Sequence, residues 1–436
     1  MWHSHANNSI KPFSSTDVKA TIEILQSPKS QIPNIERFHI ISQAEVLSEH
    51  QIRIYFHRSL ADPLGLFLFK ILPAHRFKNR YLNRSSDFVT LPEGTGPYIF
   101  KQMNPQGEIQ LSSNQYYFSG APKIKEIIMR PFTDQTIMSQ SLLFQNLDLI
   151  TYVNSNNLPE ITGDRSIGVI PYDALSFSFL ALNNNRPFLR EKRVRQALNY
   201  AVNKKEMIKA LFNNKGQIIS GPFAPTSWAY NIDVQPYKYN QKRAKKLLKL
   251  AGLTDNNGDG FLDDTRNRPL KFTIAIPLSG ETDKIKRVIL AFQGYLAKVG
   301  IKSDLQFMDW KEWKTRVIRD RDYDITIASW SFDDANNISS LFHSSNIGQW
   351  KNNFVNYRNF IVDSLITESS VTNDFQKRKA IYHKLHTILA DDAPYIWLWT
   401  LKHHAAHRQR IKSIKISPFN FFKYITKWEL ENSRKG

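Results

Sequence analysis

The middle of the chain changes its hydrophobic period twice. An apolar run from Leu175 to Leu182 predicts a buried strand, and three asparagines and Pro187 interrupt it. Apolar residues then return at helical spacing, at Val194, Ala197, Leu198, Ala201 and Val202. Asn203, with Glu206 three residues later, predicts the start of a second helix over Lys204–Phe212. A strand, a polar break and paired helices indicate a crossing between two lobes.

After this break, apolar strands alternate with amphipathic helices. The predicted strands are Leu270–Ile276, Ile301–Met308, Tyr323–Ser329 and Pro394–Leu401, and the predicted helices are 240–250, Thr282–Val299, Asp309–Ile318 and Phe375–Ala390. Strands separated by helices indicate parallel pairing, with helices across both faces of a sheet. Nearer the N-terminus we expect a helix over Asp17–Leu25 and a hairpin of His39–Val46 with Gln51–Phe56.

Composition narrows the class of protein. With 436 residues, 41% of them apolar, the chain is long enough for two or three domains with substantial cores. The net charge is +20, but the basic residues are scattered and form no nucleic-acid-binding motif, so we expect no nucleic-acid partner. Because the chain has no cysteine, disulfides, thiolate metal sites and a cysteine nucleophile are excluded.

Three phrases together resemble one protein family. They are KPFSSTDV at Lys11–Val18, GTGPY at Gly94–Tyr98 and LNNNRPFLREKRVRQALNYAVNK at Leu182–Lys204. They are similar, in the same order, to phrases of the extracellular solute-binding proteins of family 5, the oligopeptide, dipeptide and nickel type that feeds ABC importers. The resemblance covers nearly the whole chain after Lys11, and the order of the phrases is more specific than any one of them.

The resemblance implies an α/β fold with two lobes, like the type II, class C periplasmic-binding proteins, and an extra N-terminal subdomain. The expected divisions are an extra subdomain at 1–111, a first lobe at 112–184 and 402–436, and a second lobe at 185–401. The lobes would be joined at a hinge near Asn183, Asn184 and Leu401. In this family the lobes close on a ligand between them.

The start of the chain differs from the family pattern. Relatives carry a signal and a strand-rich segment before the phrase found here at Lys11–Val18, so the resemblance implies an incomplete first lobe. The residues before Lys11 have no basic region followed by an apolar core, so they do not resemble a secretory signal. The best candidate for a membrane span, Pro63–Leu72, is short and contains Lys70. By resemblance we expect a periplasmic monomer that meets the membrane only through a transporter.

The implied function is capture of a peptide and its delivery to ABC transporter permease subunits, without a cofactor. The sequence has no P-loop, nucleophile elbow or paired-histidine zinc helix, so we expect no enzyme activity. One alternative ligand is another small solute such as a nickel complex. Alternatives of a different class are a basic protein that binds surfaces and a degenerate remnant that binds nothing.

The segment SWSFDD at Ser329–Asp334 is the main candidate for ligand contact. It follows the third predicted strand, at the edge where open α/β sheets place ligands, and acids beside aromatic rings suit an ammonium group. The resemblance assigns the peptide α-amino group to Asp333, with Asp334 as the alternative, and matches Trp330 to a family tryptophan beside Phe332. The other interpretation is that the two acids cap a helix.

Two further sites remain open. Trp310 matches a family tryptophan near the ligand, or is a core aromatic of its helix. Asp255, Asn257 and Asp259 fit the first half of a calcium loop, but Arg266 stands where a closing glutamate belongs, so a polar turn is favoured. The histidine pair at 383 and 386 and the histidines at 403, 404 and 407 have no acidic partners nearby in sequence, and we expect no metal there.

Overall fold

The computed structural model describes residues 1–3, 11–32, 35–154, 156–278, 282–332 and 336–431. Its contacts divide the chain into two compact units, with unit 1 formed by Met1–Tyr172 and His403–Gly436 and unit 2 by Asp173–Lys402. The chain therefore crosses between the units twice. The first border lies before the expected hinge at Asn183 and Asn184, and the second lies beside Leu401.

In the described part of the chain, unit 1 contains three small sheets and three α-helices. Its elements are α1 (Ser15–Gln26), β1 (Ile41–Ser48), β2 (Gln51–Phe56), β3 (Tyr98–Met103), β4 (Ile109–Ser113), β5 (Glu126–Met129), α2 (Gln135–Leu143), β6 (Leu149–Ile150), α3 (Leu158–Gly163), β7 (Ile167–Asp173), β14 (Ile411–Lys412) and β15 (Glu429–Leu430). The predicted helix and hairpin near the N-terminus are confirmed as α1 and the antiparallel pair β1–β2.

Asp17 explains why α1 begins where it does. Its carboxylate accepts hydrogen bonds from the backbone N–H of Ser14 at 2.9 Å and from Nε1 of Trp2 at 3.1 Å. The Ser14 side chain in turn accepts from the helix, which completes a capping box. The backbone N–H of Ala74 donates to the other carboxylate oxygen at 2.8 Å. One buried acid thus fixes the helix start and two segments distant from it in sequence.

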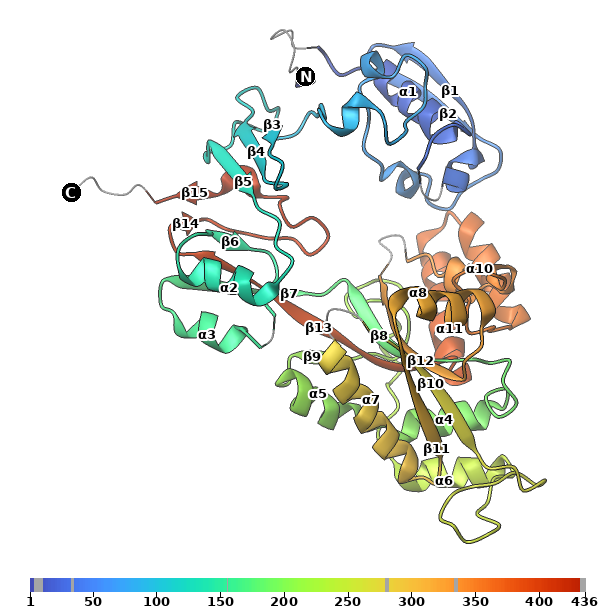
Figure 1. Ribbon diagram of the computed structural model, residues 1–436. Coiled ribbons are helices and arrows are strands. Elements are labelled where there is room, and N and C mark those ends of the chain that lie inside the picture. The colour runs from blue at the N-terminus through green and yellow to red at the C-terminus, as the bar shows by residue number, and fades with distance from the viewer. Residues whose placement is uncertain (4–10, 33–34, 155, 279–281, 333–335, 432–436) are drawn as a thin grey trace. The chain divides into compact units, whose positions relative to one another are not determined.

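Unit 2 is a mixed sheet with helices on both faces (Figure 1). Its strands are β8 (Ser176–Leu182), β9 (Gly216–Ile218), β10 (Lys271–Pro277), β11 (Lys302–Met308), β12 (Ile325–Ser331) and β13 (Tyr395–Arg408). Its helices are α4 (Lys192–Ala201), α5 (Lys204–Phe212), α6 (Gln241–Leu250), α7 (Thr282–Ala297), α8 (Trp310–Trp313), α9 (Ser339–Phe342), α10 (Phe360–Val371) and α11 (Phe375–Asp392). The helix Lys204–Phe212 and its cap are confirmed, since Asn203 accepts from the N–H of Glu206.

The strand order β11-β10-β12-β8-β13 only partly follows the predicted parallel pairing. β10 pairs in parallel with β11 and β12, as expected for strands joined by helices. β8 lies between β12 and β13 and is antiparallel to both. This insertion joins residues 182 and 325, which no local pattern places together.

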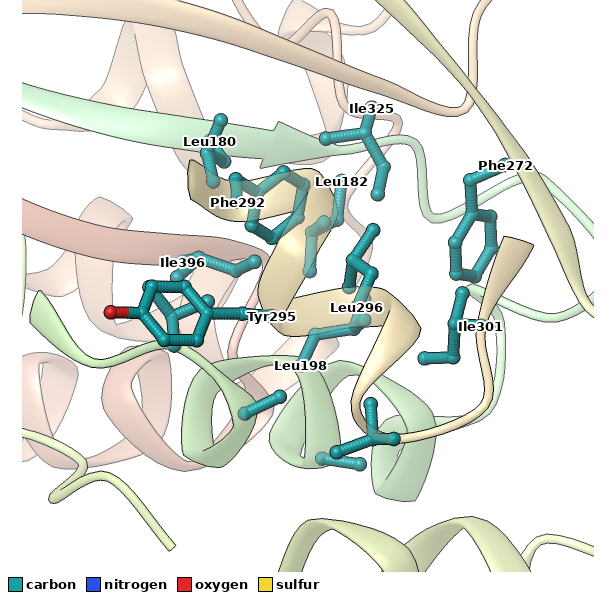
Figure 2. Packing of buried hydrophobic residues seen from close by; sticks show 14 of the residues in the cluster. Leu180, Leu182, Leu198, Phe272, Phe292, Tyr295, Leu296, Ile301, Ile325 and Ile396 are labelled. Carbon is teal, nitrogen blue, oxygen red and sulfur yellow. The ribbon is translucent and has the colours of Figure 1, made fainter. Parts of the chain in front are cut away.

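Alternate residues of the strands belong to two separate cores. Leu180 and Leu182 of β8 pack with α4 and α7, in a core that also holds Leu198, Phe292 and Ile325 (Figure 2). Phe177, Phe179 and Ala181 point to the opposite face, which α8, α10 and α11 cover. Successive side chains of a strand point to opposite faces, and both faces of β8 are covered, which explains the continuous apolar run in the sequence.

Candidate functional site

The carboxyl ends of three parallel strands of unit 2 meet at one edge of its sheet, here called the carboxyl edge. The register pairs Pro277 of β10 with Met308 of β11, and Ile274 of β10 with Ile325 of β12, so all three strands run toward the same side. Trp310 follows the end of β11, and Trp330 lies near the end of β12. Such an edge is where open α/β sheets bind ligands.

Trp330 is half-buried on an aromatic base. Its ring lies 6.4 Å from that of Phe179 at an interplanar angle of 19°, and 6.0 Å from that of Phe354. Phe179 in turn stacks on Tyr395 at 4.1 Å. Because these rings belong to β8, β13 and a neighbouring loop, the position of the Trp330 indole is fixed by packing and not by a single neighbour.

Phe332 is buried in the core of unit 2, and its contact with a ligand stays a prediction. Its side chain is 9% exposed and packs on Phe177 with ring centroids 5.0 Å apart. Its backbone N–H donates to the carbonyl of Leu175 at 2.8 Å. Phe332 therefore holds the chain in place directly before Asp333 and Asp334, and these two predicted residues lie outside the described part of the chain.

Trp310 presents an exposed indole on a rigid support. Its side chain is 52% exposed, although it stacks on Trp313 at 4.9 Å and 8°. Trp313 is buried, and its Nε1 donates to Oγ1 of Thr326 at 2.8 Å. Asp309 caps α8 by accepting from the N–H groups of Lys311 and Glu312. The interpretation of Trp310 as a core residue is wrong, and an exposed ring at the carboxyl edge is available to a ligand.

Asn183 and Asn184 lie at the opposite edge of the sheet. Nδ2 of Asn183, whose side chain is 2% exposed, donates to the carbonyls of Arg321 at 3.0 Å and Tyr323 at 2.9 Å. Asn184 donates to the carbonyl of Val355 at 3.2 Å. Both residues join parts of unit 2 to one another. Their role as a hinge stays a prediction.

The two segments that lead into and out of unit 2 are hydrogen-bonded to each other. The N–H of Ala174 donates to the carbonyl of Leu401 at 3.0 Å, and Oγ1 of Thr400 donates to the carbonyl of Ala174 at 3.2 Å. Lys402 forms an ion pair with Asp173 at 3.1 Å. These residues adjoin Leu175, which binds Phe332, so the crossing segments and the carboxyl edge are one connected structure. Sequence reasoning missed this link, because it joins residues far apart in the chain.

The calcium candidate is a hydrogen-bonded loop. Asp255 accepts from the N–H groups of Gly258 and Gly260, and Asn257 accepts from the N–H of Asp259. Oδ1 of Asp259 accepts from the N–H of Phe261, and Oδ2 pairs with Nζ of Lys302 at 2.8 Å. The Lys302 pairing lowers the pKa of Asp259. The Lys302 ammonium group therefore occupies the position beside Asp259, one of the expected calcium ligands, which favours the polar turn.

Histidine 386 uses both ring nitrogens inside unit 2. Nδ1 of His386 accepts from the N–H of Asn231 at 3.0 Å, and Nε2 lies 3.1 Å from Oγ of Ser220. Burial lowers its pKa from 6.5 to about 4.

Within the described residues, no group of three or more His, Cys, Asp or Glu side chains is arranged to hold a metal ion. The described helices also include none that is long and apolar enough to cross a membrane.

Comparison with known proteins agrees with this architecture. The model of the bacterial extracellular solute-binding proteins, family 5 middle, matches residues 6–351. The oligopeptide-binding protein AppA of Bacillus subtilis is 26% identical over 348 residues, which are 78% of this chain and 62% of that protein. The dipeptide-binding protein of Escherichia coli is 26% identical over 329 residues, 75% of this chain and 59% of the relative. The chain thus spans about three fifths of the length of these relatives.

A solved structure shows the same fold. NikZ of Campylobacter jejuni, determined in complex with Ni(L-His), superimposes with a TM-score of 0.79 at 26% identity, over 96% of this chain and 84% of that one. The predicted fold class, an α/β type II periplasmic-binding protein, is confirmed. The family match covers well over half of the chain, and the chain belongs to the bacterial extracellular solute-binding proteins of family 5.

Proposed function

We propose that this chain captures a peptide and delivers it to the permease subunits of an ABC importer. The observation that carries the proposal is the exposed Trp310 ring on its fixed support, at the edge that also holds Trp330. The names of the two peptide-binding relatives support the choice of solute. In this proposal the chain acts as a monomer on the periplasmic side of the membrane and catalyses no reaction.

The carboxyl edge offers what a peptide N-terminus requires. Aromatic rings shield an ammonium group from water and attract it through their π electrons. Asp333 or Asp334, directly after Phe332 in sequence, would add a charge-assisted hydrogen bond, which contributes about 1.5–3 kcal/mol. We assign the α-amino group to this acid pair and the first side chain of the peptide to the Trp310 ring.

Calorimetry with a pool of short peptides tests the proposal. We expect heat from peptides with free N-termini and none from the same peptides after acetylation, because acetylation removes the positive charge. Asp333→Asn should weaken binding by about 10- to 150-fold. Asp233→Asn, which changes an exposed acid elsewhere in unit 2, is the control and should bind as the unaltered protein does. Equal heats from free and acetylated pools would refute the role of the acid pair.

A nickel complex is the second candidate solute, because the NikZ structure contains Ni(L-His). Titration with Ni(L-His) in the same calorimeter separates the two candidates. Binding of the nickel complex that peptides do not displace would replace the peptide in the proposal. Absence of heat from both would refute solute capture at this edge.

A further inference from the structure

The exposed side of α6 consists almost entirely of basic residues. The helix has 10 residues, QKRAKKLLKL, and its buried side chains Ala244, Leu247 and Leu248 pack against the core of unit 2. Figure 1 shows α6 on the outer side of α4. The exposed basic side chains are Lys242, Arg243, Lys245, Lys246 and Lys249, and we call them the α6 basic face.

Within the described residues, none of these five charges has a carboxylate partner. α6 contains no acidic residue, and across the described ranges no carboxylate lies within ion-pair distance of any member of the face. Neighbouring cations differ in this respect. Lys192 pairs with Asp392 at 3.2 Å, and Arg193 pairs with Glu191 at 3.8 Å. The α6 basic face is therefore a concentrated positive charge within the general excess of the chain.

Apart from Lys249, which lies in the last turn, these charges do not stabilise the helix itself. Lys242 and Arg243 lie in its first turn, where the helix dipole is positive and cations destabilise it. Lys242 and Lys246, like Lys245 and Lys249, are four residues apart, so like charges face each other along the helix. Glutamate or glutamine at positions 242 and 243 would suit the isolated helix as well or better. An external negative partner therefore explains these cations better than helix stability does.

We propose that the α6 basic face binds a membrane surface that carries anionic phospholipid. A helix of 10 residues is about 15 Å long, so the five cations can meet several headgroups at once. Four of the five are lysines, whose compact hydrated charge suits diffuse attraction to a charged surface, whereas arginine suits bidentate recognition of one group. Leu250, 57% exposed at the end of the helix, adds an apolar contact. A protein of an extracellular family meets lipid headgroups more readily than nucleic acid.

Sedimentation with lipid vesicles tests this proposal, and it does not depend on solute capture. We expect the protein to bind vesicles of phosphatidylcholine mixed with phosphatidylglycerol, to ignore phosphatidylcholine alone, and to lose affinity as salt is added. Each lysine near such a surface contributes roughly fivefold to the partition coefficient. The triple variant Lys242→Gln, Lys246→Gln and Lys249→Gln should therefore bind about 100-fold more weakly.

A matched variant controls for net charge. Lys209→Gln, Lys377→Gln and Lys384→Gln remove three exposed lysines from α5 and α11, and this variant should bind almost as the unaltered protein does. Glutamine keeps the helix propensity of lysine, and far-ultraviolet circular dichroism checks that both variants fold. Equal losses in the two variants, unchanged binding in the α6 variant, no binding to anionic vesicles, or a preference for duplex DNA at equal phosphate would each overturn the proposal.

Discussion

Replacing Lys204 with methionine is expected to stabilise the protein near neutral pH. Lys204 is 3% exposed, and among the described residues its Nζ has one hydrogen-bond contact, 3.4 Å from Oδ1 of Asn199. The ring of Tyr237 lies 6.0 Å away. Burial lowers the pKa of Lys204 from 10.5 to about 7, because the ammonium group loses its hydration without gaining a carboxylate partner.

The size of the effect follows from the difference between the two pKa values. In the unfolded chain Lys204 keeps a pKa near 10.5, so below about pH 7 both states carry the proton and the folded state bears the full cost of a buried charge. From 10.5 to about 7, at about 1.4 kcal/mol per pH unit, this cost is about 3–6 kcal/mol. Between these pH values the unfolded state binds more protons, so the stability of the unaltered protein rises with pH.

Urea unfolding of both proteins at several pH values measures this difference. The variant should be the more stable protein at about pH 6.5, and its advantage should shrink by about 3 kcal/mol by about pH 9. Lys205→Met changes the exposed neighbour and should show no such trend. A stability difference that stays constant with pH, or a variant less stable than the unaltered protein at about pH 6.5, would refute the reasoning.

Four other substitutions test the structure. Asn183→Ala removes the side-chain donor to the Arg321 carbonyl and one of the two donors to the Tyr323 carbonyl, which Arg186 still serves, and should cost about 1–3 kcal/mol, measured by urea unfolding; a loss below about 0.5 kcal/mol would contradict the contacts. Trp310→Ala should weaken peptide binding with little change in stability, whereas Trp313→Ala should cost about 3–5 kcal/mol; the opposite order would show that Trp310 is the structural ring. His386→Gln should reduce acid sensitivity, since the lowered pKa of His386 costs the folded state about 3 kcal/mol as pH falls from 6.5 to about 4, and identical acid unfolding curves would argue against this.

Local patterns in the sequence predicted local structure well. The cap at Asn203, the helix that follows it and the strand β8 depend on residues close together in the chain, and all three are confirmed. The position of β8 between two antiparallel neighbours depends on pairing with residues far along the chain, so the expected parallel arrangement was only partly right. The border after Tyr172 has the same origin, because it is set by contacts between distant segments.

The candidate site was predictable in part. The carboxyl edge followed from the alternation of strands and helices, and Trp310 was recognised as a candidate. Its exposure was not predictable, because the choice between core and surface depends on Trp313, which is held by Thr326 of another strand. The tryptophan spacing of three within one helix was the available signal, since residues three apart lie on the same side of a helix. The role of Asp333 and Asp334 stays a prediction.

One strand belongs to both units. β13 pairs with β8 and β9 through its first half, and with β6 through Ala406 and His407. If either unit melted, one half of this 14-residue strand would lose the strands that pair with it. The other half, in the unit that is still folded, would then continue into an unfolded segment. We expect heat to melt the whole chain in one cooperative step and a protease cut between Thr400 and His404 to separate that step into two. In this protein the connection between the units is itself a source of shared stability.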